Sequence, residues 1–200
     1  MKEKDDKRAR ILDSALRVFA DKGFFGAKVS DIAAEAGVAD GTIYLYFKSK
    51  DDLLICLFEE QMTIITAELT SAMAGATDAP DKLRRFVRAY MKLVESNRRG
   101  AEVIAIELRQ SAKFMKEYSN VRFTEFLKLT ASVIDEGQRA GAFRADVPAP
   151  VAARALFGML DELALMWVTA RPGTAAKLDI ARLPDWVTSI VLQGLERRTA

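Results

Sequence analysis

The 200-residue sequence contains no histidine and only one cysteine. Without histidine the chain cannot build a Ser-His-Asp triad, an HExxH metal site or an imidazole acid–base pair. A single cysteine excludes an intrachain disulfide, and Cys56, inside the apolar run LLICLF, is expected to be buried. We therefore predict that the protein is not an enzyme and that it holds neither a metal ion nor a cofactor.

Long apolar runs and a strong net charge are also missing. No apolar stretch approaches the roughly 20 residues that span a bilayer, and the charged start is unlike a signal sequence. We therefore expect a cytoplasmic protein with no membrane partner. The net charge is only +2, so any attraction to nucleic acid has to be local. Hydrophobic residues make up 50% of the chain, which is enough to bury a sizeable core.

Apolar residues recur at three- and four-residue spacing along most of the chain, and strand-like alternation is missing. This periodicity predicts an all-α fold of about nine helices. Two short helices are expected within residues 29–47, and the others at about 7–22, 49–74, 81–96, 103–110, 114–139, 151–167 and 184–197. Residues 97–100, Asn-Arg-Arg-Gly, are expected to end the helix over 81–96 and to separate it from the next helix.

The stretch 29–52 carries the start and stop signals of two short helices. Ser30 is a suitable N-cap for the first, and a second helix is expected over 40–47. Ala39 cannot cap this second helix with its side chain, so Asp40 is expected either to cap it or to accept a bond from a cytosine amino group. Two such helices joined by a tight turn form the helix-turn-helix pattern, whose second helix enters a DNA major groove.

Side chains that can bond phosphate oxygens lie on the second helix and on both sides of it. Gly41 would also let the backbone approach DNA closely. The predicted DNA-contacting residues are Lys28, Ser30, Ala39, Asp40, Gly41, Thr42, Tyr44, Leu45, Tyr46, Lys48 and Lys50. Spacing alone leaves one alternative open, a helical hairpin without a DNA role, in which the tyrosines are core and the lysines are solvated.

The segment IAAEAGVADGTIYLYFKSKDDLL resembles the amino-terminal signature of the TetR family of bacterial transcription regulators. The matching positions are Ile32-Ala33, Ala36-Gly37-Val38, Gly41-Thr42-Ile43-Tyr44, Tyr46-Phe47, Lys50 and Leu53. The resemblance implies an amino-terminal three-helix DNA-binding domain, residues 1–48, and a helical ligand-binding and dimerisation domain, residues 49–200. Many family members carry Ser or Thr in place of Ala39, and Lys or Arg in place of Asp40, so the base that Asp40 reads is not assigned.

The last two expected helices are apolar over more of their surface than a solvent-facing helix needs. The predicted dimer-interface residues are Leu156, Leu160, Leu163, Trp167, Trp186, Ile190, Val191 and Leu195. The alternative is that these side chains close the core of a single chain. A two-fold dimer would place two recognition helices roughly 34–36 Å apart, over successive major grooves of a palindromic site, and the TetR resemblance implies the same arrangement.

Aromatic and aliphatic side chains in the middle of the chain would suit a long apolar ligand. The predicted lining residues are Phe86, Tyr90, Ile106, Phe114, Phe123, Phe126, Leu127 and Phe157. Arg85, Arg88 and Arg109 are predicted at the ligand's head group, because a guanidinium pairs well with phosphate oxygens. Such a site would suit an acyl-CoA. Ordinary core packing and a solvated charged face are the alternatives.

Two further patches, IELRQS at 106–111 and FGMLDE at 157–162, together with the signature above resemble the FadR-type subgroup of TetR regulators. That resemblance implies a repressor of fatty-acid degradation genes that long-chain acyl-CoA releases from DNA. A TetR-type repressor of an efflux or catabolic operon, responding to another hydrophobic small molecule, is the first alternative. An enzyme acting on acyl-CoA and a helical carrier with a vestigial DNA module are the others.

Overall fold

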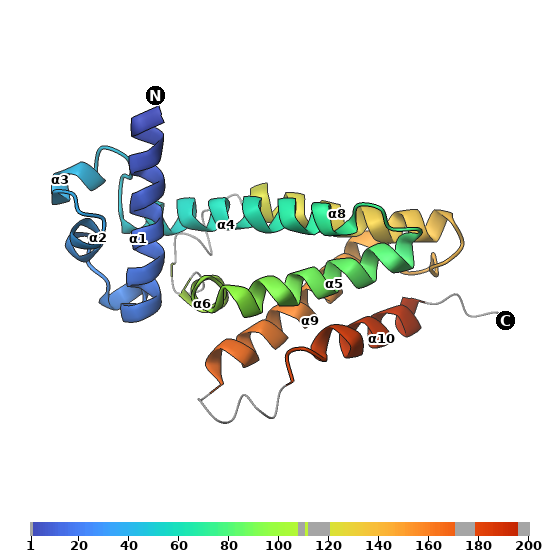
Figure 1. Cartoon of the computed structure of the whole chain (residues 1–200). Coiled ribbons are helices and arrows are strands. Elements are labelled where there is room, and N and C mark those ends of the chain that lie inside the picture. The colour runs from blue at the N-terminus through green and yellow to red at the C-terminus, as the bar shows by residue number, and fades with distance from the viewer. Residues whose placement is uncertain (1, 108–110, 112–120, 171–178, 196–200) are drawn as a thin grey trace. The chain divides into compact units, whose positions relative to one another are not determined.

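The computed structural model describes residues 2–107, 111, 121–170 and 179–195. Over these ranges the chain forms nine helices and no β-strand (Figure 1), which confirms the all-α prediction. The helices are α1 (Lys2–Gly26), α2 (Val29–Glu35), α3 (Asp40–Ile43), α4 (Lys50–Met73), α5 (Ala79–Ser96), α6 (Arg98–Ala105), α8 (Val121–Arg139), α9 (Ala149–Thr169) and α10 (Leu183–Leu195). None of them is long and apolar enough to cross a membrane.

The chain divides into two compact units. The first contains residues 1–61 and 98–119, and the second contains residues 62–97 and 120–200. The units do not follow the predicted boundary after residue 48, because the first turns of α4 belong to the first unit and because α6 packs against α1. As a boundary between functional domains, residue 48 stays a prediction.

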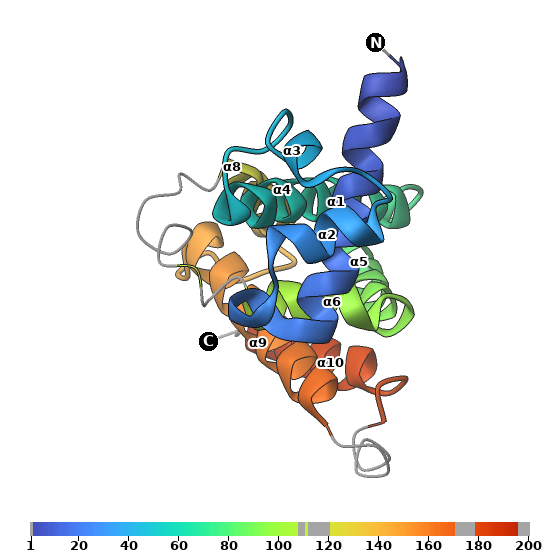
Figure 2. The ribbon, with the colours of Figure 1, turned by 90° about the vertical axis from the view of Figure 1, so that its left-hand side faces the viewer.

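Three helices form the amino-terminal part of the first unit. α1 buries Ile11, Leu12 and Phe19 almost completely on one side, and α2 packs against both α1 and α3 (Figures 1 and 2). α2 contributes Ile32 to this core and α3 contributes Ile43. Helices as short as α2 and α3 are not stable alone, so tertiary packing of these apolar side chains holds them in place.

The prediction that Ser30 caps α2 is wrong. Lys28 is the N-cap residue, in an extended conformation with φ −105° and ψ 152°. Its amide N–H donates to Asp31 Oδ2 at 2.9 Å. Because the Asp31 carboxylate satisfies an amide at the helix start, α2 begins at Val29, one residue before the predicted cap.

Asp40 does not cap α3 either. Ala39 occupies the N-cap position with extended dihedral angles, φ −70° and ψ 148°, and Asp40 lies inside the first turn. The helix ends at Ile43, and the chain continues as a turn through Tyr46, so the recognition segment is a shorter helix than predicted. The carboxylate of Asp40 therefore acts on the helix start only as a favourable charge in the first turn.

α4 begins at Lys50, one residue after the expected start, and two side chains cap it. Ser49 Oγ accepts the amide of Asp52 at 3.1 Å, and Asp52 Oδ2 accepts the amide of Lys48 at 2.8 Å. Asp78 caps α5 in the same way, by accepting the amide of Asp81 at 2.7 Å. The predicted break over residues 97–100 is too long, because α6 begins at Arg98.

The second unit is built around α5, α8, α9 and α10. α8 and α9 pack along each other, and α5 lies against α8, α9 and α10. Its core includes the fully buried side chains of Leu83, Phe126 and Leu160. Gly137 allows the turn after α8 to fold back, because a Cβ at this position would lie 2.2 Å from the ring of Phe143.

Candidate functional site

More than half of the predicted DNA-contacting residues border one shallow concavity of about 710 Å³ in the first unit. The lining residues are Phe25, Ala27, Lys28, Val29, Ser30, Asp40, Tyr44, Lys48, Ser49 and Lys50. Side chains from the α1–α2 connection, from α3 and from the start of α4 therefore meet here. Six of the eleven predicted residues are among them, and Phe25 is an addition that the sequence pattern did not predict.

The segment 41–47 has one buried face and one exposed face. Ile43 and Phe47 are buried, whereas Tyr44 is 57% exposed and Leu45 is 76% exposed. Thr42 and Tyr46 are half-buried, and Ala39 and Gly41 are exposed. Large apolar side chains held on the surface of a small module indicate a contact surface for a partner. This is the geometry that a recognition helix needs.

Lys50 has a structural role that the sequence pattern did not predict. Its ammonium Nζ donates to the carbonyl oxygens of Phe24 at 2.7 Å and of Ala27 at 3.0 Å. The same nitrogen lies 4.6 Å from the centre of the Phe24 ring. Lys50 thus ties the start of α4 to the connection between α1 and α2. Its predicted contact with phosphate stays a prediction, and Lys48, which is exposed, is the better placed ammonium.

The connection between α1 and α2 is also held by a residue from a distant part of the sequence, Glu107, in the segment that follows α6. The helical path of α1 breaks at Gly23, whose φ is +70°. The amide of Phe24 then donates to Glu107 Oε2 at 2.6 Å. Glu107 is only 8% exposed, and a buried amide at a helix break needs such an acceptor. Nearby, the Ser111 hydroxyl donates to Asp51 Oδ1 at 2.6 Å.

Ion pairs join α1 to α2. Lys22 Nζ lies 2.9 Å from Asp31 Oδ1, and Arg17 Nε lies 2.8 Å from Glu35 Oε1. The hydrogen bond from Lys22, supported by the amide of Lys28, holds the pKa of Asp31 below its usual value of 3.8. The carboxylate of Asp31 therefore serves both as a helix-start acceptor and as the partner of a cation on α1.

In the second unit, five of the predicted ligand-lining side chains come together as an aromatic cluster. Phe123 and Phe157 meet edge to face with ring centres 4.7 Å apart. Phe126 contacts Phe86 at 5.8 Å and Tyr90 at 6.4 Å. The cluster joins α5, α8 and α9. Its role as the lining of a ligand site stays a prediction.

The other predicted effector residues are more scattered. Leu127 is half-buried on α8, next to the cluster in sequence, and Ile106 is half-buried in the turn after α6, in the first unit. Arg109 and Phe114 lie outside the described residues. Among the described residues, the aromatic cluster therefore contains five of the eight predicted lining residues.

The predicted head-group arginines of α5 have partners within the second unit. Arg85 Nε lies 3.0 Å from Asp81 Oδ2, and Arg85 Nη1 donates to the carbonyl oxygen of Ala74 at 3.1 Å. The hydrogen bond from Arg85 lowers the pKa of Asp81 below its usual value. Arg88 Nη2 lies 3.2 Å from Asp185 Oδ1. Arg85 therefore fixes the loop between α4 and α5, and a head group would have to displace these contacts.

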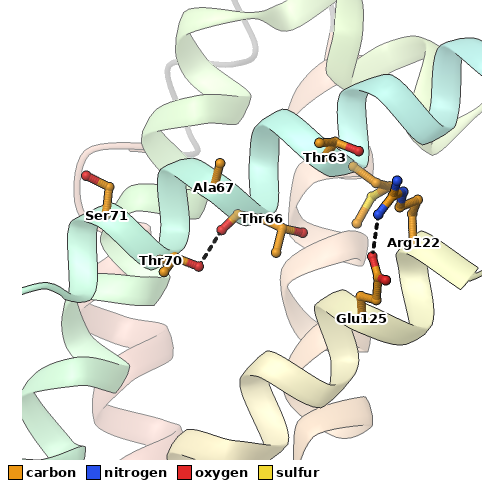
Figure 3. Close-up of a pocket in the computed structure, with 8 residues that line it drawn as sticks. Thr63, Thr66, Ala67, Thr70, Ser71, Arg122 and Glu125 are labelled. Carbon is orange, nitrogen blue, oxygen red and sulfur yellow. Dashed lines mark hydrogen bonds and ion pairs between the residues drawn. The ribbon is translucent and has the colours of Figure 1, made fainter.

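A groove of about 500 Å³ lies between the carboxyl-terminal half of α4 and the first turns of α8 (Figure 3). Its lining residues are Met62, Thr63, Thr66, Ala67, Thr70, Ser71, Arg122 and Glu125. Arg122 Nη1 donates to Glu125 Oε2 at 2.9 Å on the α8 side of the groove. None of these side chains was predicted as a site residue.

The predicted interface residues fall into three groups by exposure. Leu156, Leu160 and Leu195 are buried inside the second unit, and their predicted place in a dimer interface stays a prediction. Leu163, Trp167 and Val191 are half-buried. Trp186 and Ile190 are 44% and 59% exposed, one helical turn apart on α10, and only these two of the eight present large apolar surface.

Cys56 is half-buried on α4, less than predicted, and burial raises the pKa of its thiol. Across the described ranges, no three His, Cys, Asp or Glu side chains gather closely enough to hold a metal ion.

Two protein families match this chain, and together they cover most of its length. Residues 11–56 match the family described as bacterial regulatory proteins, tetR family, and residues 58–194 match the family described as YsiA-like protein, C-terminal region. The chain belongs to the TetR family. The alternative of a helical hairpin without a DNA role is thereby excluded. This TetR-family chain is a DNA-binding transcription regulator.

Individual relatives in the TetR family are similar over nearly the whole chain. A fatty acid metabolism regulator protein of Bacillus subtilis is 32% identical over 99% of this chain and 100% of its own length. The structure of the fatty acid degradation regulator FadR from Bacillus halodurans is 37% identical, with a TM-score of 0.85, over 96% of this chain and 97% of that one. The structure of FadR from Bacillus subtilis in complex with stearoyl-CoA is 31% identical, with a TM-score of 0.84, over 94% and 99%. The FadR-type resemblance is thereby confirmed.

Proposed function

We propose that this TetR-family protein represses fatty-acid degradation genes, that it binds a palindromic operator as a homodimer, and that long-chain acyl-CoA releases it. One observation carries the proposal. A FadR protein whose structure matches 94% of this chain, with a TM-score of 0.84, is described in complex with stearoyl-CoA.

The surface of the first unit supports operator binding. The exposed Tyr44 and Leu45 would enter the major groove, and Lys28 and Lys48 on the rim of the concavity would meet phosphate oxygens. Asp40, exposed at the start of α3, would read an amino group at a base edge. Phosphate contacts set the register of the module, and base contacts give its specificity.

For the dimer, the exposed residues of α9 and α10 are the candidates. Trp186 and Ile190 would form the centre, with the half-buried Leu163, Trp167 and Val191 beside them. Leu156, Leu160 and Leu195 would support these helices from within. Two-fold symmetry then brings two recognition helices to successive major grooves, roughly 34–36 Å apart.

For release, the aromatic cluster of the second unit would have to open. Phe86 and Phe126 are fully buried and in ring contact, so an acyl chain can enter only if rings separate and their helices adjust. α4 is one continuous helix with residues in both units, and it would carry this change to the first unit, which contains the helix-turn-helix. By linkage, acyl-CoA and operator weaken each other's binding by the same factor.

The test begins with calorimetric titration of the full chain with palmitoyl-CoA, and with palmitate and free CoA as controls. An operator duplex obtained by in vitro selection is then titrated with protein and followed by fluorescence anisotropy. We expect palmitoyl-CoA to bind near one per subunit and to release the duplex, and the two controls to do neither. If palmitoyl-CoA does not bind, the fatty-acid assignment is overturned. Release by a sterol, drug or aromatic acid instead would favour the efflux or catabolic alternative.

A further inference from the structure

The groove between α4 and α8 has the chemistry of a binding site for a polar, extended ligand. Hydroxyl-bearing side chains recur along the exposed face of α4 at positions 63, 66, 70 and 71, the spacing of one helix face. Each hydroxyl can donate one hydrogen bond and accept two. Thr70 Oγ1 donates to the carbonyl of Thr66 at 2.7 Å, which leaves its oxygen as an acceptor. Such a face matches a chain of amide groups.

The opposite wall carries one cation in a weak pair. Arg122 and Glu125 are three residues apart at the start of α8, and their side chains are each about half-exposed. An exposed pair of this kind contributes little to stability. A phosphate group can accept two parallel hydrogen bonds from a guanidinium, whereas Glu125 accepts one from Arg122. Arg122 can therefore leave Glu125 for a phosphorylated ligand.

α8 also places this polar wall next to the aromatic cluster. Arg122 and Glu125 line the groove, while Phe123 and Phe126, each one position further along the helix, belong to the cluster. A ligand with a phosphorylated head and an apolar tail needs these two environments side by side. The volume of about 500 Å³ also lies within the usual range for small-molecule sites.

We propose that the groove between α4 and α8 binds the phosphorylated, amide-bearing head of the acyl-CoA effector, and that Arg122 exchanges its Glu125 partner for a phosphate. This inference rests on the proposed function and refines it. Arg85 and Arg88, the arginines predicted for this role on α5, do not line the groove and are held by Asp81 and Asp185.

Two substitutions with opposite expected signs test the exchange. Arg122→Gln removes the cation, so the Kd for palmitoyl-CoA should rise roughly 5- to 30-fold, the loss typical of a charge-assisted contact, while the melting temperature stays the same. Glu125→Gln removes both the competitor for Arg122 and a negative charge that repels phosphate, so the Kd for palmitoyl-CoA should fall roughly two- to fivefold. If the pair were only structural, both substitutions would shift affinity in the same direction, and that result would overturn the proposal.

A matched control lies on the same helix. Arg139 pairs with Asp135 at 2.8 Å at the other end of α8 and does not line the groove, so Arg139→Gln should leave the affinity for palmitoyl-CoA unchanged. A substitution that blocks the groove tests the proposal independently of charge. Ala67→Trp fills the groove from an exposed position of α4 and should abolish palmitoyl-CoA binding without lowering the melting temperature.

The two proposals fail in different ways. Absence of palmitoyl-CoA binding to the unmodified chain overturns the proposed function. If the unmodified chain binds palmitoyl-CoA and the Arg122→Gln and Ala67→Trp variants bind it equally well, the fatty-acid function stands and the groove is excluded as the head-group site.

Discussion

Glu107 accepts the amide proton of Phe24 at 2.6 Å across 83 positions of the sequence. The carbonyl oxygen of the same Phe24 accepts a hydrogen bond from Lys50 at 2.7 Å. Both main-chain polar groups of one residue are thus bound by charged side chains of opposite sign. Because Phe24 follows the break of α1 at Gly23, these two contacts fix the direction in which the chain leaves α1 for α2. They thereby set the path of the chain into α2.

Removing the Glu107 carboxylate should destabilise the protein. Glu107→Ala leaves the buried amide of Phe24 without this acceptor, and the free energy of unfolding should fall by about 1–3 kcal/mol. Glu107→Gln keeps an acceptor oxygen and should lose less. Urea denaturation measures both, with Glu68→Gln, at an exposed position of α4, as the control. Equal losses for the alanine and glutamine variants would contradict the assigned hydrogen bond.

Lys50→Met should act mainly on stability. The change removes two hydrogen bonds to carbonyl oxygens, those of Phe24 and Ala27, and the unfolding free energy should fall by about 1–2 kcal/mol. Operator affinity should fall as well, because the connection before α2 is no longer held. A variant that loses operator affinity but unfolds at the wild-type urea concentration would show that Lys50 contacts DNA directly.

Lys48→Met should act on DNA binding and not on stability, the reverse of Lys50→Met. Lys48 is exposed, and its side chain borders the concavity of the DNA-binding module, so stability should stay unchanged while operator affinity falls. The slope of log affinity against log salt concentration should decrease by about 0.9, the value for one lost phosphate contact on duplex DNA. Anisotropy titrations at several salt concentrations give this slope. An unchanged slope would remove Lys48 from the phosphate contacts.

Asp31 should make stability depend on pH in the acid range. Its pKa is lowered in the folded state, first by the hydrogen bond from Lys22, so its contribution is present above the unfolded value of 3.8 and is lost as the pH falls through the folded value. The melting-temperature difference between wild type and Asp31→Asn should therefore be constant near neutral pH and shrink in strong acid. In a Lys22→Met background this pH dependence should largely disappear. Persistence of the full effect there would exclude Lys22 as its main cause.

Ile190→Glu should break the proposed homodimer. The side chain is exposed on α10 beside Trp186, and a charge at the centre of an apolar interface should raise the dimer dissociation constant by about 30-fold or more. Sedimentation measures this constant, and operator affinity should fall with it because half-sites are then bound singly. Val121→Glu, at an exposed apolar position of α8, is the control. A dimer of unchanged strength would place the interface elsewhere.

The parts of the fold set by local pattern could be predicted from the sequence. Helix positions follow from apolar spacing, so α4, α5, α9 and α10 lie close to their expected ranges. Helix ends are less predictable, because distant or neighbouring side chains compete for the same amides. Asp31, by accepting the amide of Lys28, moves the start of α2 ahead of Ser30.

The sites were predictable only where residue type and local spacing carry the information. The exposed Tyr44 and Lys48 could be inferred from the helix-turn-helix pattern. The role of Glu107 could not be, because its partner is a main-chain amide made available by a break at Gly23. Arg85 was expected at a head group, but an arginine pattern does not show that the carbonyl of Ala74 and the carboxylate of Asp81 are nearer partners.

The two contacts to Phe24 also bear on how new operator preferences could arise. Both are made to main-chain atoms, so they persist whatever side chains occupy the neighbouring positions. Phe25 and Lys28, on the rim of the concavity, are therefore under little constraint from the turn that carries them. Substitutions there are expected to change the contacts that this rim offers to DNA while the turn keeps its path, so this surface can diverge without a change of the fold.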